Sequence, residues 1–154
     1  MGNLVIAAIG LGSNLGDRAA HLNYAVSRLR TLLDGLRVSR FHETVPVGAP
    51  GPQPLFLNAA VVGEAAMPAR ELVETLLAIE HERGRARPYP NAPRSLDLDL
   101  LLFGDATIDE PGLVVPHPRF RERRFVLEPL AEITPDMKDP VTGKTVSELL
   151  KELG

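Results

Sequence analysis

The sequence predicts a globular protein that combines α-helices and β-strands in one domain of 154 residues. Three observations lead to this prediction. Short apolar runs, partly β-branched, alternate along the chain with longer segments whose apolar residues recur at helical spacing. Apolar residues make up 44% of the chain, which is ordinary for a globular protein, and the length suffices to bury a sizeable core. No repeat, linker or low-complexity tract divides the chain.

The amino-terminal part predicts a strand, a turn and a helix. Residues 4–11 are typical of a buried strand, and apolar residues then recur at helical spacing from about Asp17, a plausible N-cap, to Leu33. We expect the glycines of the intervening turn, at 10–17, to permit positive φ angles. Their G-x-G-x-x-x-G spacing differs from the dinucleotide-binding pattern, and no Lys-Ser/Thr pair follows as in a P-loop. The sequence therefore disfavours nucleotide binding by this turn.

Two further strands are predicted at 37–44 and 55–64, joined by a loop that is dense in proline and glycine. A loop of this length inside a compact domain is often functional. Asn58 interrupts the second strand among apolar neighbours. Its carboxamide would either satisfy backbone groups of the loop or recognise the hydrogen-bonding edge of a ligand.

A second helix is predicted to open at Pro68, a favoured first-turn position, and to end at Gly84. Its expected buried stripe comprises Leu72, Val73, Leu76, Leu77 and Ile79. The rest of the chain predicts a strand that stops at Gly104, a hairpin with strands at 106–108 and 113–115, and helices at 126–133 and 146–153.

Two carboxylates, Asp97 and Asp99, interrupt the apolar run before Gly104. Alternate residues of a strand point to the same face, so both acids project together, roughly 7 Å apart at the Cα atoms. At an effective dielectric constant of about 20, two such charges repel each other by about 2 kcal/mol. The pair therefore either faces solvent and arginines, or holds a hard cation such as Mg²⁺, which favours one or two carboxylates plus substrate phosphates.

The arginines gather in two windows although the chain carries a net charge of −3 and a pI of about 5.8. One window lies just before the acidic strand and the other surrounds a proline-flanked histidine, His117; they hold Arg83, Arg85, Arg87 and Arg94, and Arg119, Arg121, Arg123 and Arg124. Local arginine clusters on an acidic protein favour a small anionic ligand, such as a polyphosphate, over general nucleic-acid binding.

Composition also bears on the compartment. Cysteine is absent, so the sequence offers neither a disulfide framework nor a thiolate metal site. No apolar run approaches the length of a membrane span, and the amino-terminal apolar stretch lacks the basic region that precedes it in a signal peptide. We expect a cytoplasmic protein without membrane or nucleic-acid partners.

Several motifs together resemble one enzyme family over nearly the whole chain. They are G-S-N-L-G-D at 12–17, T-V-P-V-G at 44–48, F-L-N-A-A at 56–60, R-x-R at 85–87, R-S-L-D-L-D at 94–99, V-P-H-P at 115–118 and R-R-F at 123–125. In this order and spacing the chain resembles 6-hydroxymethyl-7,8-dihydropterin pyrophosphokinase of folate biosynthesis. The resemblance implies a ferredoxin-like α+β sandwich, a mostly antiparallel sheet with helices packed on it.

The resemblance also implies transfer of a pyrophosphoryl group from ATP to the pterin hydroxymethyl group, with AMP leaving. It implies two Mg²⁺ ions held by Asp97 and Asp99, and catalytic roles for these acids together with Arg85 and Arg94. The implied ATP-binding residues are Glu80, Arg85, Arg87, Arg94, His117 and Arg123. The implied pterin-binding residues are Thr44, Val45, Val47, Phe56, Asn58 and Phe125, the two phenylalanines stacking on either face of the pterin. We further expect a monomer.

The chain departs from some family members at Pro90 and Asn91, where those members carry Arg-Trp, and Tyr89 is the available substitute for that tryptophan. Two other hypotheses stay open. A non-catalytic ferredoxin-like module could bind a nucleotide or RNA through the arginines, since this fold hosts many functions. A metal-dependent nucleotide hydrolase would release AMP or ADP without any pterin.

Overall fold

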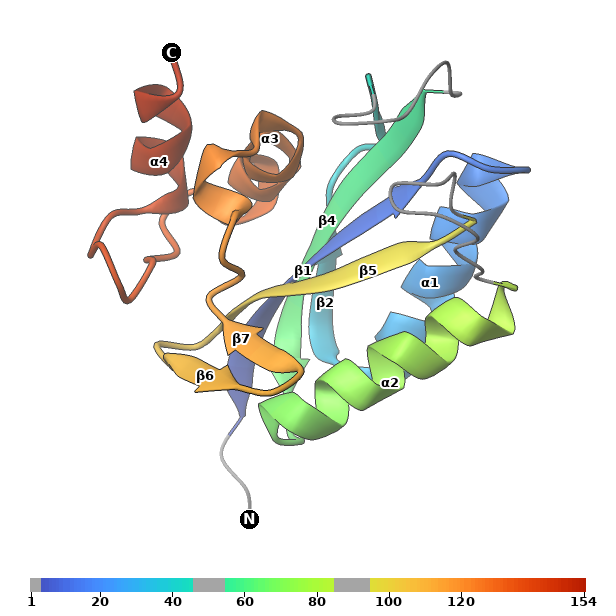
Figure 1. The fold of residues 1–154 in the computed structure, drawn as a ribbon, viewed down its shortest axis with the longest axis horizontal. Helices are drawn as coiled ribbons and strands as arrows, with labels where there is room; N and C mark the ends of the chain where they lie inside the picture. Colours follow the sequence, from blue (N-terminus) through green and yellow to red (C-terminus); the bar gives the residue numbers. More distant parts are fainter. Residues whose placement is uncertain (1–3, 46–54, 85–94) are drawn as a thin grey trace.

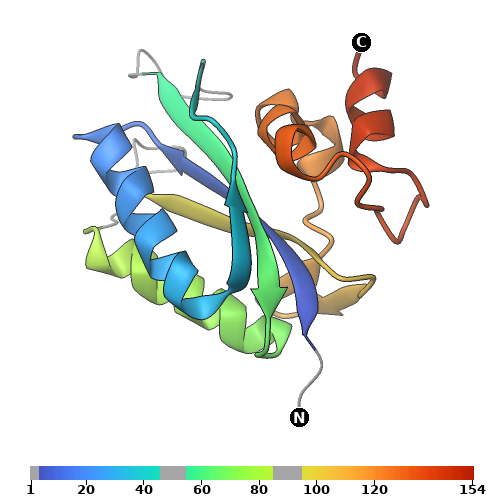
Figure 2. The same ribbon diagram turned by 180° about the vertical axis from the view of Figure 1, so that it is seen from behind.

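The computed structural model describes residues 4–45, 55–84 and 95–154. A sheet forms the centre of the molecule, with helices on both of its faces (Figures 1 and 2). Its strands run antiparallel in the order β2-β4-β1-β5, and a further strand, β3, pairs with β4. These strands are β1 (Val5–Ser13), β2 (Asp34–Val38), β3 (His42–Thr44), β4 (Phe56–Ala65) and β5 (Asp97–Phe103). The order is that of a ferredoxin-like α+β fold, as predicted.

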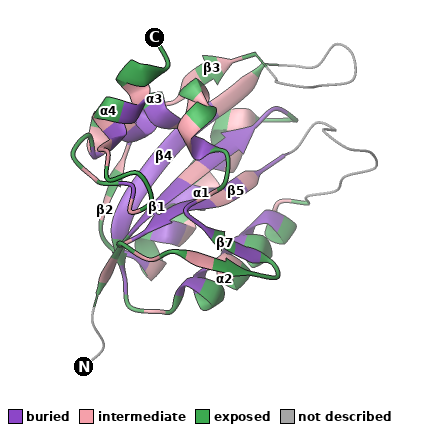
Figure 3. Ribbon diagram, turned by 60° about the vertical axis from the view of Figure 1, so that its left-hand side comes forward, coloured by how far each residue is buried: buried purple, intermediate pink, exposed green. Residues whose placement is uncertain are grey.

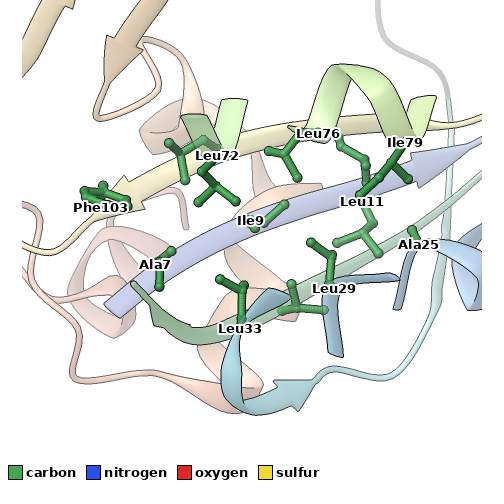
Figure 4. Close-up of a cluster of buried hydrophobic side chains, with 14 of the residues drawn as sticks. Ala7, Ile9, Leu11, Ala25, Leu29, Leu33, Leu72, Leu76, Ile79 and Phe103 are labelled. Carbon is green, nitrogen blue, oxygen red and sulfur yellow. The ribbon is translucent and has the colours of Figure 1, made fainter. Parts of the chain in front are cut away.

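Helices α1 (Arg18–Leu32) and α2 (Ala69–Glu82) cover one face of the sheet and form the larger core (Figures 1 and 4). Alternate residues of β1 point into this core, where they pack against the apolar faces of the two helices. The labelled side chains in Figure 4 are Ala7, Ile9, Leu11, Ala25, Leu29, Leu33, Leu72, Leu76, Ile79 and Phe103.

The opposite face is covered by α3 (Arg124–Ile133) and α4 (Val146–Glu152), which lie beside each other in Figure 1. Its smaller core includes Ala8 and Val62 from the sheet and Leu127 and Leu130 from α3. The buried residues in Figure 3 follow the central strands and the inner sides of the helices. A short 3-10 helix, η1 (Phe120–Glu122), precedes α3, and a hairpin of β6 (Ile108–Glu110) and β7 (Leu113–Val115) follows β5.

Most predicted elements are confirmed within one to three residues. Asp17 caps α1 and accepts a hydrogen bond from the Ala20 N–H at 3.1 Å. Gly84 ends α2 with a φ of 73°. Pro68, however, is the N-cap of α2 rather than a residue of its first turn. Leu77 is 46% exposed because it lies at the margin of the stripe, so the predicted buried stripe was too wide.

The predicted strand at 37–44 is wrong in detail, because it is two strands. Val38 pairs with Val61, whereas His42 pairs with Asn58, so the register shifts by one residue between them. Ser39 accounts for the shift: its N–H donates to the Ala60 carbonyl, and its hydroxyl accepts from the Ala60 N–H, both at 2.9 Å. A side chain thus replaces one backbone partner of the ladder, as at a bulge.

The predicted turn at 10–17 begins too early. Gly10 and Gly12 lie inside β1, and of the glycines in this stretch only Gly16 has a positive φ, 73°. Gly10 and Gly12 are therefore strand residues that pair with the acidic strand β5. Among the described residues, no helix combines the length and apolar character that a membrane span requires.

Candidate active site

The two strand glycines lie on the sheet face that carries α3 and α4, where the side chains of neighbouring strands cover them. Even-numbered residues of β1 point to this face, where Ala8 is packed under the helices. Farther along the strand, Gly10 pairs with Asp99 of β5 and Gly12 pairs with Asp97. On the other side, Gly12 pairs with Asn58 of β4. A polar row, Asp97–Gly12–Asn58, therefore crosses three strands with no side chain at its centre.

The predicted orientation of the two acids is confirmed. Leu98 and Leu100 point into the core under α1 and α2, so Asp97 and Asp99 point to the opposite face. Both carboxyl-bearing residues are partly exposed. They pair with Gly10 and Gly12 of β1, which have no side chains that would compete for the same space.

Glu80, near the end of α2, is only 2% exposed, and its carboxylate is hydrogen-bonded to the strand that carries the two aspartates. Its Oε2 accepts a hydrogen bond from the Leu98 N–H at 2.6 Å. Leu98 lies between the two aspartates on the outer edge of the sheet, so Glu80 fixes the strand that carries them. This contact gives Glu80 a role in shaping the site beside the ATP contact that the resemblance implies.

His117, which follows the hairpin in the sequence, is hydrogen-bonded to the same strand, β5. Its N–H donates to the Leu101 carbonyl at 2.9 Å, and its Nδ1 accepts from the Arg119 N–H at 3.1 Å. Burial lowers the pKa of His117, and the charge of Arg123 lowers it further, against the opposing effect of Asp97. The neutral ring therefore keeps Nε2 as its donor, and Arg123 and Asp97 each lie within electrostatic range of His117.

The predicted pterin-binding residues of the sheet gather around Gly12. Asn58, 6% exposed, donates from Nδ2 to the Thr44 hydroxyl across the β3–β4 pair. A Cβ placed on Gly12 would lie 3.0 Å from Asn58 Oδ1 and 3.6 Å from Phe56 Cδ1. The carboxamide and the Phe56 ring thus lean over the glycine. Val45, just after β3, is 73% exposed.

Phe125 lies in the first turn of α3, on the same side of the sheet as Phe56. Both rings are partly exposed, which a stacking role requires. The Arg123 guanidinium lies over the Phe125 ring, 5.6 Å from its centroid. A cation and an aromatic ring are therefore already paired where the segment after His117 enters α3.

A cleft of about 240 Å³ opens along the outer edge of β5, between α2 and the hairpin. Val73 and Leu77 of α2 form one wall, and Gly112–Val115 of the hairpin form the other. Glu80 and residues Asp97–Leu100 form its floor. Leu77, which was predicted to be buried, is exposed because it lines this cleft.

Four predicted residues, Val47, Arg85, Arg87 and Arg94, lie outside the described residues.

Over the described ranges, no group of three or more His, Cys, Asp or Glu side chains is arranged to hold a metal ion. Two carboxylates on one open face still fit Mg²⁺, which usually binds one or two protein carboxylates and completes its shell with phosphate and water. The donor set does not suit zinc, which prefers nitrogen and sulfur ligands.

Comparison with known proteins decides the family. The model of the family described as 7,8-dihydro-6-hydroxymethylpterin-pyrophosphokinase (HPPK) matches residues 8–135. The chain belongs to the HPPK family. It is therefore an ATP-dependent pyrophosphokinase of folate biosynthesis, which transfers a pyrophosphoryl group from ATP to hydroxymethyldihydropterin, as the resemblance implied.

Relatives named 2-amino-4-hydroxy-6-hydroxymethyldihydropteridine pyrophosphokinase support this assignment. The protein of Synechocystis sp. is 41% identical over 96% of the chain and 75% of the relative, and that of Bacillus subtilis 45% identical over 90% and 83%. A crystal structure of wild-type Plasmodium falciparum HPPK-DHPS has a TM-score of 0.74 at 17% identity. It matches 99% of this chain, which spans 45% of that longer chain, and the likeness confirms the HPPK fold.

Sequence reasoning missed two parts of the candidate site. Gly12 was assigned to a turn, because nothing local shows that Asn58 and Phe56 fill the space above it. The cleft beside β5 was also missed, although an apolar residue at the margin of a helical stripe, such as Leu77, is a signal that could have indicated it.

Proposed function

We propose that Asp97 and Asp99 would hold two Mg²⁺ ions together with the phosphates of ATP. The support is chemical: two partly exposed oxygen-donor side chains share one face of the sheet. The ions, when bound, would neutralise phosphate charge and polarise the attacked phosphorus. They would also offset the repulsion of about 2 kcal/mol between the acids.

We propose that the nucleoside of ATP occupies the cleft between α2 and the hairpin. Its volume of about 240 Å³ and its apolar walls suit a base and a ribose, and Asp97 and Asp99 stand on its floor. Glu80 would keep the floor in place through the Leu98 N–H. The phosphates would then lie over the acids, within reach of His117 and Arg123 and, by the family resemblance, of Arg85, Arg87 and Arg94.

The pterin would lie at the other end of the polar row. Asn58 and Thr44, with backbone groups at Val45 and Val47, would pair with its hydrogen-bonding edge, and Phe56 and Phe125 would stack on its faces. Adjacent strands are about 4.8 Å apart, so Asp97 and Asn58 are separated by roughly 10 Å at the backbone. That span allows the pterin ring and the reacting phosphate to be bound side by side.

The reaction would then be an in-line displacement. The pterin hydroxyl oxygen forms a bond to the β-phosphorus of ATP, the bond from that phosphorus to the α–β bridging oxygen breaks, and AMP leaves. Asp97 is our candidate for the group that accepts the hydroxyl proton, although the transfer does not require a protein base. The Nε2–H of neutral His117 and the Arg123 guanidinium would donate to phosphate oxygens as charge develops, so catalysis is mainly positioning and electrostatic stabilisation.

We propose that residues 1–154 act as a single domain, as a monomer and in the cytoplasm, in line with the sequence expectations. None of the chemistry proposed above needs a residue from a second copy.

The observation that supports this proposal best is the polar row Asp97–Gly12–Asn58, which joins the acid pair to the predicted pterin edge across one glycine. The test mixes the protein with ATP, Mg²⁺ and 6-hydroxymethyl-7,8-dihydropterin and measures AMP. We expect AMP that depends on both the pterin and Mg²⁺. AMP or ADP formed equally without pterin would support a nucleotide hydrolase instead. ATP binding with no product would support the non-catalytic module.

A further inference from the structure

Asp139 is a buried carboxylate that no step described so far uses. It is 0% exposed and accepts two hydrogen bonds from Arg121, from Nε at 2.5 Å and from Nη2 at 2.9 Å. The Val141 N–H and the Thr142 hydroxyl donate to the same carboxylate at 3.0 and 2.8 Å. Four donors thus satisfy a fully desolvated acid, an arrangement far stronger than an exposed ion pair.

Arg121 belongs to η1, the short helix between His117 and Arg123. Its guanidinium also lies over the Phe120 ring, 4.9 Å from the centroid, and Phe120 is fully buried. The ion pair therefore fixes the position of η1 on the smaller core. His117 and Arg123 flank η1 directly, so a shift of this helix would displace both of them.

The carboxylate is itself held firmly by its own segment. The Asp139 N–H donates to the Lys144 carbonyl, and the Gly143 N–H donates to the Asp139 carbonyl, both at 2.8 Å. Immediately after this turn, Thr145 caps α4 through a capping box with Glu148. Asp139 thus connects η1 to a turn that α4 anchors in the core.

We propose that Asp139 is a positioning residue for the pyrophosphoryl transfer. Through Arg121 it holds the segment from His117 to Arg123 against β5, so that both side chains stay over the phosphate site beside Asp97. The His117 N–H bond to Leu101 fixes the start of this segment, and the Arg121–Asp139 pair fixes its end. The inference rests on the proposed roles of His117 and Arg123 in binding ATP.

The two substrates should respond differently when this anchor is lost. Helix α3, which begins just after Arg123, has anchors of its own: Leu127 and Leu130 are fully buried. At its far end, Glu132 accepts from the Arg40 N–H at 3.0 Å and contacts His42 of β3. Phe125 should therefore keep its place better than Arg123, and pterin binding should suffer less than ATP binding.

The test compares Asp139→Asn with Glu122→Gln. Glu122 pairs with Arg119 in the same segment, from Nε to Oε1 at 2.9 Å, but both side chains are exposed and the pair does not reach the carboxy-terminal turn. Each variant removes one carboxylate charge from an arginine near η1. Arg121→Lys, which keeps the charge but loses the paired donors, serves as a second variant should Asp139→Asn fail to fold.

Steady-state AMP formation is measured for each folded variant, together with the affinity for a non-hydrolysable ATP analogue and Mg²⁺ by calorimetry. We expect Asp139→Asn to raise the KM for ATP and weaken analogue binding by roughly ten- to a hundredfold, the range for a small displacement of positioned groups. The KM for the pterin should change much less, and Glu122→Gln should stay near wild type. A simple loss of folded enzyme would instead lower kcat and leave both KM values unchanged.

Equal kinetics and equal analogue affinity in Asp139→Asn, or in Arg121→Lys if that is the folded variant, and in Glu122→Gln would overturn the inference. So would a loss confined to kcat. If the wild type formed no AMP but bound the analogue, the proposed reaction would fail, and the analogue affinities alone would decide the role of Asp139. If the wild type neither turned over nor bound the analogue, both proposals would be wrong.

Discussion

Gly12→Ala tests whether Asn58 and Phe56, which lie over Gly12, bind the pterin. The added Cβ would lie 3.0 Å from Asn58 Oδ1, closer than most real Cβ contacts, and 3.6 Å from the Phe56 ring. The carboxamide has to move by a few tenths of an ångström, because the β-strand backbone on both sides of Gly12 is paired. Its bond to the Thr44 hydroxyl, and its alignment with a pterin edge, are then disturbed.

The expected magnitude follows from these contacts. Misaligning hydrogen bonds to one ligand edge removes about 1–2 kcal/mol, which corresponds to roughly a five- to thirtyfold higher KM for the pterin. Alanine in place of a strand glycine favours the folded state by about 0.5–1 kcal/mol, and this gain offsets much of the local strain. The free energy of unfolding should therefore change by less than about 1 kcal/mol, and the KM for ATP should stay near wild type.

Gly10→Ala is the matched control in the same strand. Its Cβ would meet only the Leu101 side chain, at 3.6 Å, an ordinary van der Waals distance. The assay is steady-state AMP formation with the pterin varied at saturating ATP and Mg²⁺, with urea unfolding measured in parallel. A folded Gly12→Ala enzyme with an unchanged pterin KM, or one no worse than Gly10→Ala, would refute the placement of the pterin beside Asn58 and Phe56.

Three other outcomes are expected. Replacing Asp97 or Asp99 by alanine should leave a folded protein without measurable AMP formation; near-normal turnover in either variant would show that the metal assignment is wrong. Phe125→Ala should weaken pterin binding by at least about 1 kcal/mol while leaving ATP binding mostly intact, as calorimetry with each ligand can establish; comparable losses would argue against stacking. The third concerns acid stability. Burial raises the pKa of Asp139, but Arg121, Thr142 and the Val141 N–H outweigh it and lower the pKa from 3.8 to about 2. The unfolded chain then binds the proton more readily, so about 2 kcal/mol of stability is present above pH 4 and lost as the pH falls towards 2. Asp139→Asn should flatten the urea-midpoint profile between these pH values, and an unchanged slope would contradict the shift.

The acid pair could be predicted from the sequence because strand alternation is a local property. Once residues 97–103 were assigned to a strand, Asp97 and Asp99 had to share a face, whatever the rest of the fold. The helix termini at Asp17 and Gly84 were predicted for the same reason, since capping depends on neighbours within one turn.

The larger errors concern interactions between distant parts of the chain. Ser39 breaks the predicted strand only because it pairs with Ala60, far away in sequence. Gly10 and Gly12 resemble turn residues locally, yet pairing with β4 and β5 keeps them extended. Asp139 sits in a polar turn with no pattern of its own, and its importance depends on Arg121 meeting it in space.

The position of the site follows from how the second face of the sheet is covered. Helices α3 and α4 bury Ala8 and Val62 of the central strands. Farther along β1 other side chains take over: Leu101 lies over Gly10, and Asn58 and Phe56 lie over Gly12. A glycine in a strand costs about 0.5–1 kcal/mol relative to alanine. At Gly12 this cost lets the Asn58 carboxamide and the Phe56 ring lie close to the strand, which is where the proposed pterin site needs them.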